Sequence, residues 1–128
     1  MALTYTKANQ LLNQLNGRGS TIYIGLSLDA PNRDGTGVRE PSTNAGYKRM
    51  RLQSSQMSEP QNGVTTNVET IYFAEATAQW GVCTYFCLFG GGTVGGNDLL
   101  AYGALPQSIA PTDQQVALIR TGNLTMSM

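Results

Sequence analysis

Residues that commonly perform catalysis or bind metals are scarce in this sequence of 128 residues, and histidine is absent. Without histidine, the chain lacks the usual general base at neutral pH and the commonest metal ligand of proteins. An enzyme would have to work with carboxylates, lysine or tyrosine, and the carboxylates are scattered along the sequence. A pair of carboxylates brought together by the fold, as in glycosidases, is the remaining enzymatic alternative. We therefore expect a protein that is not an enzyme and has no catalytic residues.

The two cysteines do not form a recognisable metal or redox motif. Cys83 and Cys87 are four residues apart in a segment rich in β-branched and aromatic residues, which favours a strand. In a strand both would face the same side with their Cα atoms about 13 Å apart, too far for a disulfide between them. No further cysteine or histidine exists to complete a zinc site. The sequence favours two small buried side chains, with an intermolecular disulfide as the alternative.

A glycine-rich run follows the same segment. Residues 90–95 match the pattern Gly-x-Gly-x-x-Gly, which in some proteins marks a dinucleotide site. Such a site needs a helix directly after the glycines, because the helix N-terminus holds the pyrophosphate. Residues 97–102 instead predict a strand. We interpret 90–97 as a hairpin turn and expect no cofactor.

A long polar loop, residues 29–46, is the main candidate for contact with another protein, because loops of this length usually have a function of their own. Asp29, Asn32 and Asp34 loosely resemble a calcium loop, but the distal glutamate of an EF-hand is missing, so we expect no metal. A second polar stretch, 54–63, and the N-terminal segment are further candidates. The residues predicted to contact a partner are Asp29, Asn32, Arg33, Asp34, Arg39, Glu40, Gln56 and Met57.

Aromatic and basic residues offer two further alternatives. Trp80, just before a predicted strand, is by default a packing anchor. The alternative is an exposed ring that stacks on a carbohydrate ligand, with Tyr47 as a second stacking residue. Lys48, Arg49 and Arg51 form the only basic cluster, and we expect their side chains on a solvent-facing or partner-facing side of a strand. Phosphate binding is the alternative for this cluster.

The elements that must position these residues are mainly strands. Apolar residues at helical spacing predict one amphipathic helix at about 5–16, capped by Thr4 or Thr6 and ended by Gly17. After it the apolar period changes to two, which is typical of strands. The most hydrophobic segment, 81–89, is predicted to lie centrally and to form a hairpin with 99–105. The other predicted strands are 21–28, 47–53, a run ending at 73, 114–120 and 124–128.

This pattern predicts one domain, residues 1–128, with a β-rich body from 21 to 128. Short strands separated by turn residues are typical of an antiparallel β-sandwich or open barrel. The eight basic and eight acidic residues cancel, which argues against a nucleic-acid partner. No apolar stretch is long enough for a membrane span and no signal peptide is recognisable, so we expect synthesis in a cytosol and no membrane. A weakly charged surface favours association with other copies.

Several short segments are shared, in order, with one family of proteins. They are YIGLS at 23–27, EPS at 40–42, GYKR at 46–49, IYFAEAT at 71–77, WGVCTYF at 80–86 and GNDLLAYGAL at 96–105. With the N-terminal helix and the closing segment 122–124, they resemble small bacteriophage virion structural proteins, often described as tail-fibre-like or head-decoration-like. The resemblance covers nearly the whole chain and implies a virion component, made in the cytoplasm of a bacterial host. The family has no catalytic residues to transfer.

The position within the virion follows from what the chain lacks. A fibre needs a shaft, and this sequence has neither coiled-coil heptads nor a solenoid repeat. We therefore expect a capsid decoration or cement protein, or a head, neck or tail accessory protein, on the particle exterior. The alternative is a tail fibre or a receptor-binding or glycan-binding module. The expected partners are copies of the chain itself and major capsid, neck or tail subunits, with a host surface glycan under the alternative.

Overall fold

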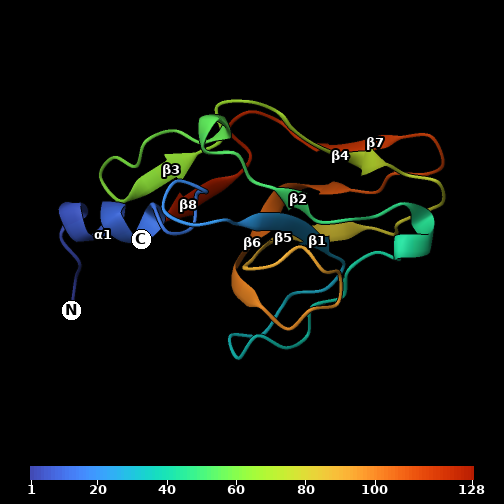
Figure 1. The fold of residues 1–128 in the computed structure, drawn as a ribbon, viewed down its shortest axis with the longest axis horizontal. Helices are drawn as coiled ribbons and strands as arrows, with labels where there is room; N and C mark the ends of the chain where they lie inside the picture. Colours follow the sequence, from blue (N-terminus) through green and yellow to red (C-terminus); the bar gives the residue numbers. More distant parts are fainter.

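The computed structural model describes residues 1–128 and has the mainly β fold that the sequence predicts, with one α-helix near the N-terminus (Figure 1). All strand pairs are antiparallel, and the strands do not form a closed barrel. Two short 3-10 turns, Thr43–Ala45 and Ser54–Gln56, lie between the strands. The other elements are α1 (Tyr5–Leu12), β1 (Tyr23–Ser27), β2 (Met50–Arg51), β3 (Val64–Thr66), β4 (Ile71–Glu75), β5 (Cys83–Phe89), β6 (Leu99–Ile109), β7 (Val116–Ile119) and β8 (Thr125–Ser127).

The central sheet has four strands in the order β2-β1-β5-β6, so β5 lies in its interior, as its apolar sequence predicts. Ile24 and Leu26 of β1 pair with Leu88 and Phe86 of β5. On the other side of β5, Phe86 pairs with Gly103 of β6. A Cβ atom at Gly103 would lie 2.7 Å from the Phe86 ring, so this position has room only for glycine. The predicted hairpin between β5 and β6 is confirmed.

The two faces of the central sheet are covered differently. Strands β4 and β7 form a two-stranded ribbon over one face, and the loops of residues 29–46 and 90–98 lie on the other side of the sheet (Figure 1). The buried residues of the ribbon join Ile24 and Leu26 in one hydrophobic cluster. They are Ile71, Phe73, Ala117 and Ile119. The core therefore lies between the ribbon and the sheet, and most of the two loops form a separate layer that reaches the core at Ala45 and Val94.

Helix α1 packs beside β3 and β8, at the end of the molecule where both termini lie (Figure 1). Thr4 caps it as predicted, because its hydroxyl accepts a hydrogen bond from the backbone N–H of Lys7. The helix ends at Leu12, four residues earlier than expected, since the chain then tightens into turns up to Asn16. Gly17 has the predicted left-handed conformation, but it ends these turns and not the helix. The structure contains no helix long and apolar enough to cross a membrane.

The predicted strand at 47–53 is reduced to the two residues of β2. Only Met50 and Arg51 pair with β1, opposite Ile24 and Tyr23. The backbone before Met50 is not part of the sheet, which lets the side chains of that segment enter the layer of loops. The predicted strands near the C-terminus also shorten, to β7 and β8.

A buried asparagine joins the turn after β7 to the segment that leads into β4. Asn67 is 1% exposed. Its amide nitrogen donates to the carbonyl oxygens of Glu69 and Arg120, at 2.9 and 3.0 Å. Its amide oxygen accepts from the N–H groups of Gly122 and Leu124, each at 3.0 Å. This one side chain bonds four buried or partly buried backbone groups; the N–H of Gly122 and the carbonyl of Arg120 also have backbone partners, whereas the buried N–H of Leu124 depends on Asn67.

Candidate functional site

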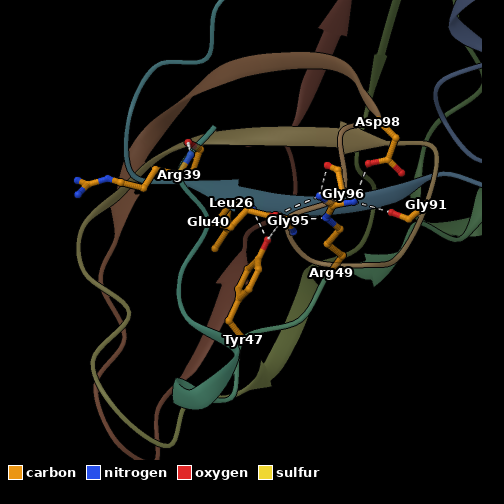
Figure 2. Close-up of polar contacts among 10 residues, drawn as sticks. Leu26, Arg39, Glu40, Tyr47, Arg49, Gly91, Gly95, Gly96 and Asp98 are labelled. Carbon is orange, nitrogen blue, oxygen red and sulfur yellow. Dashed lines mark hydrogen bonds and ion pairs between the residues drawn. The ribbon is translucent and has the colours of Figure 1, made fainter. Parts of the chain in front are cut away.

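An ion cluster centred on Arg49 lies in the layer of loops (Figure 2). The Arg49 side chain has no exposed surface. Its Nε and Nη2 atoms lie 2.9 and 3.0 Å from the two carboxylate oxygens of Glu40, a bidentate pair. Its Nη1 atom lies 2.9 Å from Oδ1 of Asp98. A fully buried guanidinium thus binds carboxylates from two distant segments of the chain.

The remaining bonds of Arg49 go to the backbone of the glycine-rich loop. Nη1 donates to the carbonyl oxygen of Gly91 at 2.9 Å and Nη2 to that of Gly96 at 3.1 Å. All five N–H groups of the guanidinium are therefore bonded. The guanidinium carbon also lies 3.4 Å from the centre of the Phe89 ring, a cation-π contact. Burial acts to lower the pKa of Arg49, but the hydrogen bonds to Glu40 and the other carboxylate outweigh it and raise the pKa.

The Glu40 carboxylate, like the Arg49 guanidinium, is hydrogen-bonded to several groups. Its side chain is 5% exposed. Besides Arg49, it accepts hydrogen bonds from the Tyr47 hydroxyl at 2.7 Å and from the N–H of Gly95 at 2.9 Å. The Tyr47 oxygen in turn accepts from the N–H of Leu26 in β1, at 3.1 Å. Burial, and then the negative charge of Glu40, raise the pKa of Tyr47 far above its ordinary value.

These contacts fix two loops against each other and against the sheet. We call residues 29–46 and 90–98 the loop platform, and Figure 1 shows both on the same side of the central sheet. Between them lies a groove of 480 Å³, lined by residues 35–40 and 94–97 together with Phe89 and Leu99. Because the buried charges are bonded to one another, the platform presents a rigid and largely polar surface. Such a surface is suited to contact with another molecule and holds no free acid or base in its buried cluster.

Five of the residues predicted to contact a partner are exposed on this platform. Figure 2 shows the Arg39 side chain directed away from the cluster, and its Nε atom lies 2.9 Å from Asp29. Both side chains of this ion pair are more than half exposed. Their role as partner contacts stays a prediction. The exposed residues are Asp29, Asn32, Arg33, Asp34 and Arg39.

The predicted resemblance to a calcium loop has a structural explanation. Asp34 accepts hydrogen bonds from the hydroxyl and the backbone N–H of Thr36, at 2.6 and 3.0 Å, and both bonds lower the pKa of Asp34. The amide of Asn32 donates to the same hydroxyl at 3.1 Å. These polar residues therefore close a local turn. No group of three or more acidic or cysteine side chains gathers to hold a metal ion.

Two of the predicted contact residues are misplaced. Glu40 lies inside the ion cluster, and Met57 is 1% exposed and belongs to the hydrophobic core. Neither side chain is free to contact a partner, so both predictions are wrong. The polar sequence around Met57 hid its role as an apolar anchor for that stretch. Gln56 is half-buried, and its side chain accepts from the N–H of Gln53 at 2.8 Å.

The two proposed stacking residues are buried, so carbohydrate stacking on them is wrong. Trp80 is 3% and Tyr47 2% exposed. The indole N–H of Trp80 donates to the carbonyl of Ala45 at 2.8 Å. Its ring packs edge-to-face against Tyr47 and Phe73, with centroids 5.2 and 6.4 Å away. The default interpretation of Trp80 as a packing anchor is confirmed.

The cysteines are both free and buried, as favoured from the sequence. Burial raises the pKa of Cys83 to about 11 and that of Cys87 to about 12, with a further contribution from Glu40 in the second case. They do not share one environment, as a regular strand would predict. Cys83 belongs to the core cluster, whereas Cys87 lies within the influence of Glu40 and Arg49. The pairing register of β5 shifts between Cys83 and Tyr85, which interrupts the regular alternation.

The residue that organises this site was misjudged from the sequence. Arg49 was expected on a solvent-facing or partner-facing side, but only its neighbours Lys48 and Arg51 are exposed. The role of Asp98 was also missed. The glycine-rich run was interpreted as a hairpin turn only, and the bonds from Arg49 to two of its carbonyl groups were not predicted. Arg49 lies between Lys48 and Met50 in the sequence, and this local pattern does not distinguish it from an exposed arginine.

The comparisons with known proteins agree with the expected resemblance. The model of a family described as podophage GP4 fiber I protein gp80 matches residues 2–127. No curated protein matches the chain. The matched region includes the central sheet, the loop platform and the Arg49 cluster. The chain therefore belongs to the podophage GP4 fiber I protein gp80 family, a family of phage fibre proteins.

Proposed function

We propose that this protein is a non-enzymatic subunit of a podophage fibre, and that its loop platform contacts another virion protein. The family description supports a fibre role over the capsid decoration or cement role that the absence of a shaft suggested. In this proposal the chain is made in the host cytoplasm and acts on the particle exterior. A shaft, where the fibre has one, is supplied by other chains.

The observation that carries the proposal is the fully bonded Arg49 cluster beneath the platform. A loop that is already ordered before binding loses little conformational entropy when it binds. The buried charges of Arg49 and Glu40, together with the partly exposed Asp98, hold two loops in one arrangement, and none of the three belongs to the hydrophobic core. The exposed polar residues of the platform, such as Arg33 and Asp34, are then presented in fixed positions.

Receptor or glycan binding is a weaker proposal for this chain. It was based on ring stacking by Trp80 and Tyr47, and both rings are buried. A protein partner requires no such rings, because a polar platform can bind through hydrogen bonds and exposed charges.

Incorporation into particles tests the proposal. A phage lacking the gene is complemented with the wild-type chain, with Arg33→Glu on the platform, or with the control Arg120→Glu. Both arginines are exposed and have no ion pair, so the two changes of charge are matched. We expect Arg33→Glu to reduce the amount of protein in purified particles, while Arg120→Glu leaves it unchanged. Absence of the wild-type protein from particles, or equal incorporation of the two variants, would contradict the proposal.

A further inference from the structure

The outer edge of β6 has no partner strand. β6 is the last strand in the order β2-β1-β5-β6 and, at 11 residues, the longest strand of the molecule. It contains no charged residue along its whole length. Natural sheets usually protect a free edge with charged residues, proline, a bulge or a covering segment, because unpaired N–H and C=O groups attract other strands. The edge of β6 therefore presents backbone groups ready for pairing.

The sequence of this edge is close to symmetric about Tyr102. Residues 99–105 read Leu-Leu-Ala-Tyr-Gly-Ala-Leu. A twofold contact between identical chains needs a surface that is complementary to itself. Antiparallel pairing about Tyr102 would place Leu99 opposite Leu105 of a second copy, and Leu100 opposite Ala104. No like charges would face each other across the pair, and Leu99 and Leu100 would each lie opposite another apolar side chain.

Structural features at both ends of this symmetric segment would limit pairing to the segment itself. Pro106 follows it directly and has no N–H to donate, so pairing would stop there. Beyond Ala104 the strand also bulges away from β5, because the next paired residue is Ile109, opposite Cys83. At the other end, the register shifts by one residue at Leu100. The protective features lie at the ends of the segment, and its middle has none.

We propose that β6 pairs with β6 of a second copy, antiparallel and about a twofold axis at Tyr102, so that the two central sheets form one continuous sheet. Tyr102 already packs against Tyr85, with ring centroids 6.5 Å apart, and both rings are half-exposed. The second copy would cover these rings and place the two Tyr102 side chains side by side. This edge adjoins the loop platform at Leu99, which also lines the groove, but the pairing uses the backbone of β6, so the inference does not rest on the proposed contact with another virion protein.

Charges introduced at facing positions of the two β6 strands test both the interface and its register. Leu100 is 53% exposed and Ala104 is also exposed, so charges at these positions leave the folded monomer intact. In the double variant Leu100→Lys/Ala104→Lys, like charges would face each other twice across the axis. In the double variant Leu100→Glu/Ala104→Lys, opposite charges would face each other twice. Sedimentation equilibrium of the purified full-length chain, from 1 to 100 µM, measures the dimer dissociation constant of each.

We expect the wild type to form a dimer. The dimer dissociation constant should rise by roughly tenfold or more in the Lys/Lys variant and return towards the wild-type value in the Glu/Lys variant. A monomeric wild type at 100 µM overturns the proposal, as does a Lys/Lys variant that dimerises like the wild type. Equal weakening of both variants overturns the register about Tyr102. The platform variant Arg33→Glu should dimerise normally, which separates this test from that of the proposed function.

A second measurement covers the case in which the Lys/Lys variant does not fold. Amide hydrogen exchange of the wild type at 5 and 100 µM reports on backbone pairing directly. We expect slower exchange in residues 99–105 at the higher concentration and no change in β7 or β8. Exchange in 99–105 that does not depend on concentration overturns the proposal.

Discussion

Removal of the Arg49 guanidinium is the most informative perturbation of this fold. In the variant Arg49→Met, a side chain of similar length still fills the space against Phe89 but makes no hydrogen bonds. Glu40, with a side chain 5% exposed, would lose its bidentate partner. The carbonyl groups of Gly91 and Gly96 would also lose a donor. Breaking a buried ion pair by removing one member destabilises proteins by about 3–5 kcal/mol.

The sequence supplies a matched control. Arg39 also forms an ion pair with a carboxylate, at the same 2.9 Å distance, but its side chain is 63% exposed and that of Asp29 is 57% exposed. Exposed pairs contribute about 0–1 kcal/mol, because water and salt screen them. Arg39→Met should therefore lower the free energy of unfolding by at most about 1 kcal/mol. The comparison keeps the substitution and the lost charge constant, while the burial of the arginine and the number of groups bonded to it differ.

Urea denaturation measures the difference, with the fluorescence of Trp80, the only tryptophan, as the signal. For a slope of about 2 kcal/mol/M, the midpoint should fall by about 2 M in Arg49→Met and by less than about 0.5 M in Arg39→Met. The double variant Arg49→Met/Glu40→Gln should recover part of the loss, since no unpaired charge remains buried. Equal losses in the two single variants would refute the argument that the buried cluster holds the loops.

Three further predictions concern the interior. Asn67→Ala should lower the free energy of unfolding by about 2 kcal/mol, because four backbone groups lose a hydrogen bond and the buried N–H of Leu124 is left without a partner, while the exposed control Asn97→Ala should change it by less than about 0.5 kcal/mol. Trp80→Phe should lower it by about 1–3 kcal/mol through the lost bond to Ala45, measured by circular dichroism. Raising the pH above about 9 should destabilise the fold. The pKa values of Cys83 and Cys87 rise from 9.0 to about 11 and about 12 on folding, so the unfolded chain loses protons that the folded chain retains.

Each of these predictions has a contrary outcome that is easy to recognise. Similar losses for Asn67→Ala and Asn97→Ala would mean that the Asn67 bonds contribute little. An unchanged stability of Trp80→Phe would contradict the buried bond to Ala45. The double variant Cys83→Ala/Cys87→Ala should show a weaker fall of stability between pH 9 and 11 than the wild type, and an identical fall would assign the pH dependence to other groups. Below pH 9 the thiol contribution is fully present, so the two proteins should then show the same pH dependence.

Local patterns were sufficient to predict most elements of this fold. The helix cap at Thr4, the interior position of β5 and the hairpin to β6 each depend on residues close together in the sequence. The Arg49 cluster could not be predicted in this way, because its partners Glu40 and Asp98 are 9 and 49 residues away. Whether an arginine is buried depends on whether the fold brings carboxylates to it, and that information is not local.

The same reasoning explains the errors at the candidate site. Alternation in 47–53 predicted a strand with two distinct faces, but only Met50 and Arg51 pair with β1. The segment leaves the sheet so that Tyr47 can reach Glu40 and the N–H of Leu26. An aromatic residue beside polar ones was therefore compatible with an exposed stacking role or a buried one. Only the three-dimensional arrangement separates the two.

The Arg49 cluster also has a consequence for the order in which the loop platform forms during synthesis of the chain. Residues 91, 96 and 98, to which Arg49 binds, leave the ribosome about fifty positions after the arginine itself. A nascent or truncated chain that ends before them can still pair Arg49 with Glu40, but it lacks the second loop and its bonds to Arg49. The loop platform is therefore complete only after residue 98 has been synthesised, so under the proposed function a chain that ends earlier would lack half of its contact surface.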